Sequence, residues 1–125
     1  MKSVLLLAAI IIFFSCKKDP VTKPVPVIEI ATPTNNQHYV MGETINITGT
    51  VSSSIPLTEV AVHMTDLTTK VEFFHNHFSG GEQLAYSYNS FYLVSDHTKN
   101  SFKVEVEATD KDGTATSKEI TITIN

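Results

Sequence analysis

Two histidines, His75 and His77, lie one residue apart in the segment FFHNHFSGG at residues 73–81. Alternate residues of an extended strand face the same side, and at a rise of about 3.3 Å per residue their Cα atoms would lie about 7 Å apart. Two imidazoles at this spacing can share a metal ion. A zinc site needs three or four protein ligands, so further ones are required. The candidates are His97, Asp96, Glu82, His63 and His38.

The turn with the sequence DLTT bears on whether His63 belongs to this group. A loop of two or four residues pairs His63 with Glu72 and directs the apolar residues after the turn into the core. A loop of three residues would place His63 beside His75 but would expose Val71 and Phe73. We therefore expect His63 to face away from the histidine pair.

The metal site that this reasoning predicts consists of His75, His77 and His97, and it would hold Zn²⁺ or Cu²⁺. Asp96 and Glu82 remain alternatives to the third ligand. A different interpretation is that the two histidines only line the end of a strand that turns at residues 80–81. Under that interpretation the protein has no cofactor.

The acidic turn DKDG at residues 110–113 resembles turns that bind calcium in some extracellular β domains. Calcium takes six to eight oxygen ligands, and two carboxylates are too few. We therefore predict a structural hairpin turn in which Gly113 supplies a positive φ angle.

A group of aromatic residues could either form an exposed surface for a glycan or protein, or fill the core. Its members are Tyr86, Tyr88, Phe91, Tyr92, Phe74 and Phe78. The serines and threonines offer no nucleophile in a G-x-S-x-G turn. We assign no catalytic residue and predict that the protein is not an enzyme.

The first residues have the pattern of an export signal. Lys2 precedes an apolar run of eleven residues, 4–14, which is too short to cross a bilayer and fits the apolar region of a signal peptide. The junction FFSC that follows resembles a bacterial lipobox, which implies cleavage before Cys16 and lipidation of that cysteine. We predict a signal peptide at 1–15, a lipidated tether rich in Pro and Lys at 16–26, and an outer-membrane lipoprotein.

Composition excludes some functions of the remaining domain, residues 27–125. It has five lysines, no arginine and twelve acidic residues, for a formal charge of −7. Nucleic-acid binding depends on clustered Lys and Arg, so we exclude it. Cys16 is the only cysteine of the chain, so no intrachain disulfide can form.

Apolar residues alternate with polar ones along most of residues 27–125, and no segment keeps a helical period. The clearest examples are the segments at 102–108 and 120–124, which we predict to form a hairpin. A change of parity before Phe91 and Leu93 predicts a bulge near residues 89–90. Seven or eight short strands in about 100 residues favour an all-β, immunoglobulin-like two-sheet antiparallel sandwich.

The tether and the run that begins VIEIATPTNNQHYVMGETINITG resemble the Ig-like domains of Gram-negative surface lipoproteins. The FFHNHFSGG segment further resembles domain-of-unknown-function family 4625. These resemblances imply the fold and a location in the cell envelope. Our first functional hypothesis is a non-catalytic binding or adhesion module held there by the lipid on Cys16. Its partner would be an envelope protein, a host surface or a glycan. A metal-binding lipoprotein and a structural spacer are the alternative functions.

Overall fold

The computed structural model describes residues 22–95 and 99–125, and Cys16 and the signal peptide lie outside these ranges. Within them all regular secondary structure is β-strand, which confirms the all-β prediction. No helix with the length and apolar character of a membrane span occurs in the described residues. The strands are β1 (Val27–Thr32), β2 (Gln37–Tyr39), β3 (Thr44–Ser52), β4 (Leu57–Asp66), β5 (Glu72–Ser79), β6 (Ala85–Leu93), β7 (Asn100–Asp110) and β8 (Ala115–Ile124).

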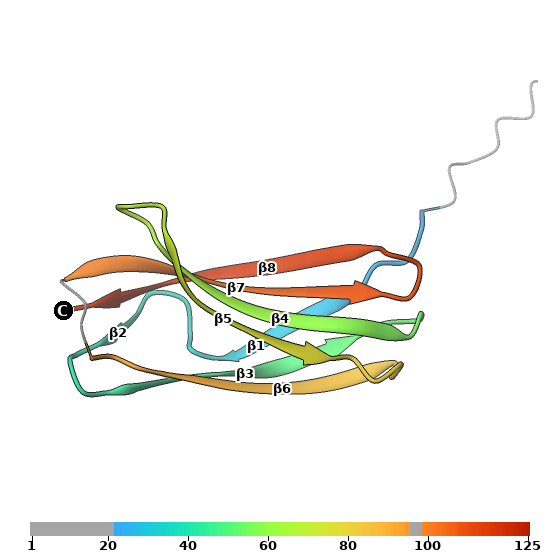
Figure 1. Ribbon diagram of the computed structural model, residues 1–125, viewed down its shortest axis with the longest axis horizontal. Helices are drawn as coiled ribbons and strands as arrows, with labels where there is room; N and C mark the ends of the chain where they lie inside the picture. The colour runs from blue at the N-terminus through green and yellow to red at the C-terminus, as the bar shows by residue number, and fades with distance from the viewer. Residues whose placement is uncertain (1–21, 96–98) are drawn as a thin grey trace, which may run out of the picture.

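The strands form two stacked sheets, as Figure 1 shows. One sheet has three strands in the order β1-β3-β6, and the other has five in the order β2-β8-β7-β4-β5. All pairs are antiparallel except β2 with β8, which is parallel. The immunoglobulin-like sandwich predicted from the sequence is confirmed.

The core lies between the sheets and is built by alternate residues of β3, β4, β7 and β8. Burying a large aliphatic side chain completely stabilises the fold by about 1.5–3 kcal/mol. Side chains with no more than 1% exposure include Ile45, Ile47, Val51, Val60, Val62, Met64, Phe102, Val104, Val106, Ile122 and Ile124.

The β7–β8 hairpin is the part of the chain that follows its sequence pattern most closely. Phe102 pairs with Ile122 across the ladder, and Gly113 in the turn has a φ of 79°. The Asp110 side chain accepts hydrogen bonds from the backbone N–H groups of Asp112 and Thr114, both at 2.9 Å. The carboxylate therefore holds the turn closed.

Strand β6 differs from the sequence prediction. It pairs with β3 without interruption from Ala85 to Leu93, so the bulge expected near residues 89–90 was wrong. Its inward set includes the buried Ser90, which accepts a hydrogen bond from the Asn76 amide at 3.3 Å. Phe91 points outward instead. The inward residues of β6 were assigned wrongly from hydrophobicity, because the hydrogen-bonded polar pair Asn76 and Ser90 lies on the inner side here.

The segment at residues 32–42 connects β1 to β3 and contains the short strand β2. Its residues Gln37–Tyr39 pair with Ile122–Ile124 of β8 and so cover one edge of the five-stranded sheet. Three residues are too few for an alternation pattern to be recognised. β5 forms the other edge of that sheet.

Candidate functional site

The register between β4 and β5 places His63 directly opposite His75. The expectation that His63 faces away from the histidine pair was therefore wrong. Ala61 pairs with His77 in the next row on the same face. Three histidines thus lie on the outer face of the five-stranded sheet, two on the edge strand and one on its neighbour.

A bulge in β5 explains the error. Thr65 pairs with Glu72 and Met64 with Phe74, so Phe73 is an extra residue in the ladder. Its ring remains inside, with its centroid 5.4 Å from that of Phe102, while Val71 before the bulge is 57% exposed. Both phenylalanines therefore stay on the core side although the histidines face outward.

The three imidazoles form one cluster. The ring centroids of His75 and His77 are 5.4 Å apart, and those of His63 and His77 are 5.7 Å apart. The third separation, between His63 and His75, is 6.4 Å. We refer to His63, His75 and His77 as the histidine cluster.

Two glutamates contact the histidine cluster. The Glu72 carboxylate lies 3.1 Å from Nδ1 of His63 and 3.4 Å from Nδ1 of His75. Glu59 lies 3.3 Å from Nδ1 of His77. Nδ1 of His63 is buried, and within the described residues it has no aligned hydrogen bond despite its short distance to Glu72. In all three rings it is Nδ1, and not Nε2, that faces a carboxylate.

Of the other predicted ligands, the structure describes Glu82 and His38, and both lie away from this cluster. His97 and Asp96 lie outside the described residues. Glu82 follows β5 and accepts a hydrogen bond from Lys111 at 3.2 Å. His38 lies on β2, at the opposite edge of the sheet. Across residues 22–95 and 99–125, no three or more His, Cys, Asp or Glu side chains form a ready-made ion cage.

The sheet around the histidine cluster is acidic. Five glutamates occupy outward positions of β4, β5, β7 and β8 as the pairing places them: Glu59, Glu72, Glu105, Glu107 and Glu119. Among the outward positions of these four strands, within the described residues, Lys103 is the only lysine. It donates a hydrogen bond to Glu105 at 2.8 Å, which raises the pKa of Lys103. This face therefore favours cations.

The outer face of the three-stranded sheet has different chemistry. Along β3 and β6 its outward residues carry no charge: Thr44, Asn46, Thr48, Thr50, Ser52, Ala85, Ser87, Asn89, Phe91 and Leu93. The charged residue of this face is Glu29 on the edge strand β1, directly across from Thr50. Phe91 is 69% exposed and pairs with Asn46. We call six of the uncharged residues the neutral face: Asn46, Thr48 and Thr50 on β3, and Ser87, Asn89 and Phe91 on β6.

Of the six aromatic residues that could have formed a binding surface, five pack on the core. Tyr88 is 2% exposed, and Tyr86, Tyr92, Phe74 and Phe78 lie against the core partly buried. Phe91 alone among the six belongs to the neutral face. The aromatic residues are therefore mainly structural, with one exception.

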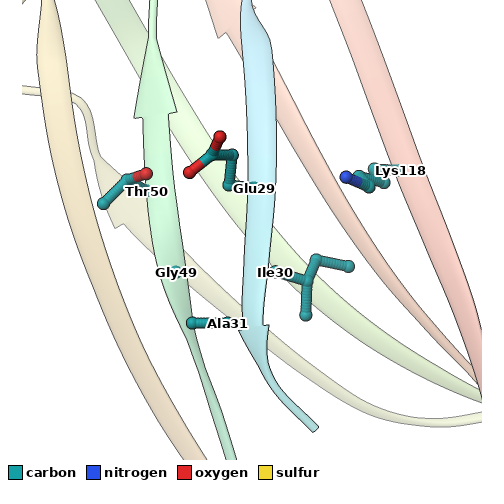
Figure 2. A pocket seen from close by; sticks show the side chains of 6 residues that line it. All are labelled: Glu29, Ile30, Ala31, Gly49, Thr50 and Lys118. Atoms are coloured by element: carbon teal, nitrogen blue, oxygen red, sulfur yellow. The ribbon is translucent and has the colours of Figure 1, made fainter. Parts of the chain in front are cut away.

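An open hollow of about 310 Å³ lies where β1 passes β8. Figure 2 shows the Glu29 carboxylate between β1 and β3, and Ile30 and Lys118 on the other side of β1. Gly49 forms part of its lining, and Tyr88 donates a hydrogen bond to the Glu29 carbonyl oxygen at 2.7 Å nearby. Its lining residues include no pair of groups arranged as nucleophile and base.

Comparison with known proteins adds information on the fold. No family model matches the chain, and no curated protein matches it. Among solved structures, the chain is similar to the fibronectin(III)-like modules of Clostridium thermocellum CbhA, with a TM-score of 0.55 and 18% identity. That match covers 82% of this chain and 48% of the other, so the chain spans about half the length of that structure.

Two further similarities have lower identity. A Niemann-Pick type C2 protein from the Japanese carpenter ant gives a TM-score of 0.53 at 12% identity, covering 82% of this chain and 92% of that one. The superoxide reductase (neelaredoxin) of Ignicoccus hospitalis gives a TM-score of 0.50 at 11% identity, and the match covers 81% of this chain and 80% of that one. At these identities the similarities show the fold alone. The chain is a β-sandwich of the fibronectin III and immunoglobulin-like kind.

Proposed function

We propose that the protein is a lipoprotein anchored through Cys16 in the outer membrane, and that its sandwich is a non-catalytic module that binds a neutral glycan. The observation that supports this function is the neutral face, an uncharged surface of hydroxyl and amide side chains around the exposed ring of Phe91. The envelope anchor rests on the resemblance of residues 13–16 to a lipobox.

The chemistry of the neutral face matches that of a sugar polymer. The flat apolar side of a pyranose ring packs on an aromatic ring, which is 69% exposed at Phe91. Asn46 lies directly across from Phe91, and Asn89 lies across from Thr48 in the next row of the same face. Amides and hydroxyls both donate and accept hydrogen bonds, as sugar hydroxyls require.

The face also disfavours other partners. An anionic polymer would need lysine or arginine, and the outward positions of β3 and β6 carry neither. Exposed strands with regularly spaced polar side chains present a flat surface, which suits an extended chain better than a compact small molecule in a pocket.

The glycan proposal is tested by depletion of the full-length protein from solution by insoluble neutral glucan, with an anionic polysaccharide resin as comparison. Wild-type protein should bind the glucan and not the anionic resin. Phe91→Ala should weaken binding about fivefold, because a ring contact contributes about 1 kcal/mol. Val71→Ala removes another exposed apolar side chain, directly before β5 of the other sheet, and should bind as wild type does. Equal binding by the Phe91 variant, or no binding by wild type, would refute the proposal.

The anchor is tested separately. Cys16→Ala removes the proposed lipid attachment and should move the protein from the membrane fraction to the soluble fraction of cells. Continued membrane association of this variant would contradict lipidation at Cys16 and leave the glycan test unaffected.

A further inference from the structure

We propose that the histidine cluster binds one divalent transition-metal ion, Zn²⁺ or Cu²⁺, on the outer face of the five-stranded sheet. The site lies on the opposite sheet from the neutral face, so it is independent of glycan binding. Its protein ligands are His63, His75 and His77. The sequence predicts His97 as the third ligand, and that residue lies outside the described ranges, whereas His63 lies beside the pair.

The spacing of the three rings suits a single ion. A Zn–N bond of about 2.0–2.1 Å places each ring centroid about 3.2 Å from the metal, so two ligands at a tetrahedral angle have centroids about 5.2 Å apart. The observed separations are 5.4, 5.7 and 6.4 Å. The backbone thus already holds the rings near the required distance, with His63 and His75 the widest pair.

Small side-chain rotations complete the site. The side chains of His75 and His77 are 63% and 50% exposed, so they turn without disturbing the core. His63 is only 18% exposed and is therefore the fixed member of the set. Because its Nδ1 is buried, Nε2 is the nitrogen that meets an ion arriving from solvent.

The two glutamates support binding through Nε2. Glu72 lies against Nδ1 of His63 and His75, and Glu59 lies against Nδ1 of His77. A carboxylate that accepts the Nδ1–H of a histidine fixes the tautomer with Nε2 free and makes that nitrogen a better ligand. One carboxylate spanning two rings also restricts their orientation. Every ring of the histidine cluster has a carboxylate within 3.1–3.4 Å of its Nδ1, and a small rotation of the carboxylate or the ring would align each contact as such a hydrogen bond.

The type of donor selects the metal. Three imidazole nitrogens suit Zn²⁺, Cu²⁺, Ni²⁺ and Co²⁺, whereas Mg²⁺ and Ca²⁺ prefer oxygen ligands. Zinc with three histidines keeps a fourth position for water or another ligand. The glutamates on this face, including Glu105 opposite His63, attract a cation and offset its charge.

The test is a titration of the purified full-length protein, free of any histidine tag, with Co²⁺ followed by its visible absorption, and then displacement by Zn²⁺. Wild-type protein should bind one ion per chain with the intense bands of four-coordinate cobalt. Bound Zn²⁺ should raise the unfolding temperature, since a ligand specific for the folded state stabilises it. Affinity should fall as the pH is lowered, because protons compete with the metal for the imidazole nitrogens.

Variants assign the ligands. His77→Ala and His75→Ala should each weaken binding by more than about 100-fold, and Glu59→Gln by about tenfold, as expected for an outer partner of a ligand. His38→Ala is the matched control, since it removes an exposed histidine at the other edge of the sheet, and its affinity should equal that of wild type. Unfolding of each variant without metal reports whether the fold is retained.

Three results would overturn the proposal. The first is micromolar or tighter binding that survives in the His75→Ala, His77→Ala double variant. The second is wild-type binding no tighter than millimolar, and the third is an equal loss in His38→Ala. Failure of glucan binding would not bear on this site, because the two experiments use different ligands and different variants.

Discussion

The two outer faces of the sandwich use the same backbone geometry for opposite chemistry. On the five-stranded sheet the outward positions carry glutamates, one lysine and the histidine cluster, and on the strand pair β3–β6 they carry none of these. Because alternate residues of a strand face opposite sides, the inward residues secure the fold and the outward ones are free to differ. One small domain can therefore present two unrelated surfaces.

The sheets also differ in how their inner sides are joined. In the three-stranded sheet, Tyr88 lies over Gly49 and donates a hydrogen bond to the Glu29 carbonyl oxygen. Between the sheets, Asn76 of β5 donates to the buried Ser90 of β6. The first contact fixes β1, β3 and β6 to one another, and the second joins the strand of His75 and His77 to the strand of Phe91. Changes at these contacts separate the two faces experimentally.

The largest expected effect is that of Gly49→Ala. A Cβ atom there would collide with the Glu29 carbonyl oxygen and the Tyr88 hydroxyl, so the three-stranded sheet must distort. We expect a loss of about 3 kcal/mol in the free energy of unfolding. Urea denaturation measures this loss, and Thr50→Ala at the exposed neighbouring position should change stability by less than about 0.5 kcal/mol. Equal effects of the two substitutions would contradict this packing.

A smaller effect is expected from Asn76→Ala, which leaves the buried Ser90 hydroxyl without this partner. The cost should be about 1–2 kcal/mol, because a buried polar group loses its hydrogen bond. Ser87→Ala, exposed on the same strand as Ser90, should be nearly neutral in the same denaturation experiment. If the contact holds β5 in place, the metal affinity should also fall in Asn76→Ala. No change in either the free energy of unfolding or the metal affinity would show that this contact does not couple the two faces.

The smallest effect concerns alkaline pH. Burial raises the pKa of Tyr88 from its ordinary value of 10.0 to about 12. The folded state therefore favours the neutral phenol, so this stabilisation is complete below pH 10 and is lost as the pH rises through 12. Tyr88→Phe should cost about 1 kcal/mol at neutral pH. The variant should also lose less free energy of unfolding between pH 10 and 12 than wild type does. An unchanged loss would exclude Tyr88 as its source.

The fold followed from the sequence wherever apolar residues alternate regularly. The β7–β8 hairpin shows this, since Phe102 and Ile122 pair as the pattern requires and Gly113 takes a positive φ. Alternation failed for β6 because Ser90 is buried and Phe91 is not. A polar pair in the core has no hydrophobic signal, so its presence could not be inferred from one strand alone.

The candidate metal site was predicted only in part. His75 and His77 were identified from their spacing, but His63 and Glu72 were missed as their neighbours because register depends on the bulge at Phe73. Two adjacent phenylalanines before an alternating segment were a usable signal, since both can face the core only if one of them is the extra residue of a bulge. The position of a cross-strand neighbour is a tertiary property that spacing within one strand cannot specify.

The position of β1 has a mechanical consequence. Residues 22–26 lead into β1 at the end of the sandwich where the β7–β8 turn lies, and β1 belongs to the same sheet as Phe91 (Figure 1). A pulling force between a membrane tether and a polymer held at Phe91 would pass from β1 through β3 to β6. It would load the hydrogen bonds of two antiparallel ladders along the strand direction, in shear, so that many bonds share the load at once. The five-stranded sheet, with the histidine cluster, would carry none of that tension.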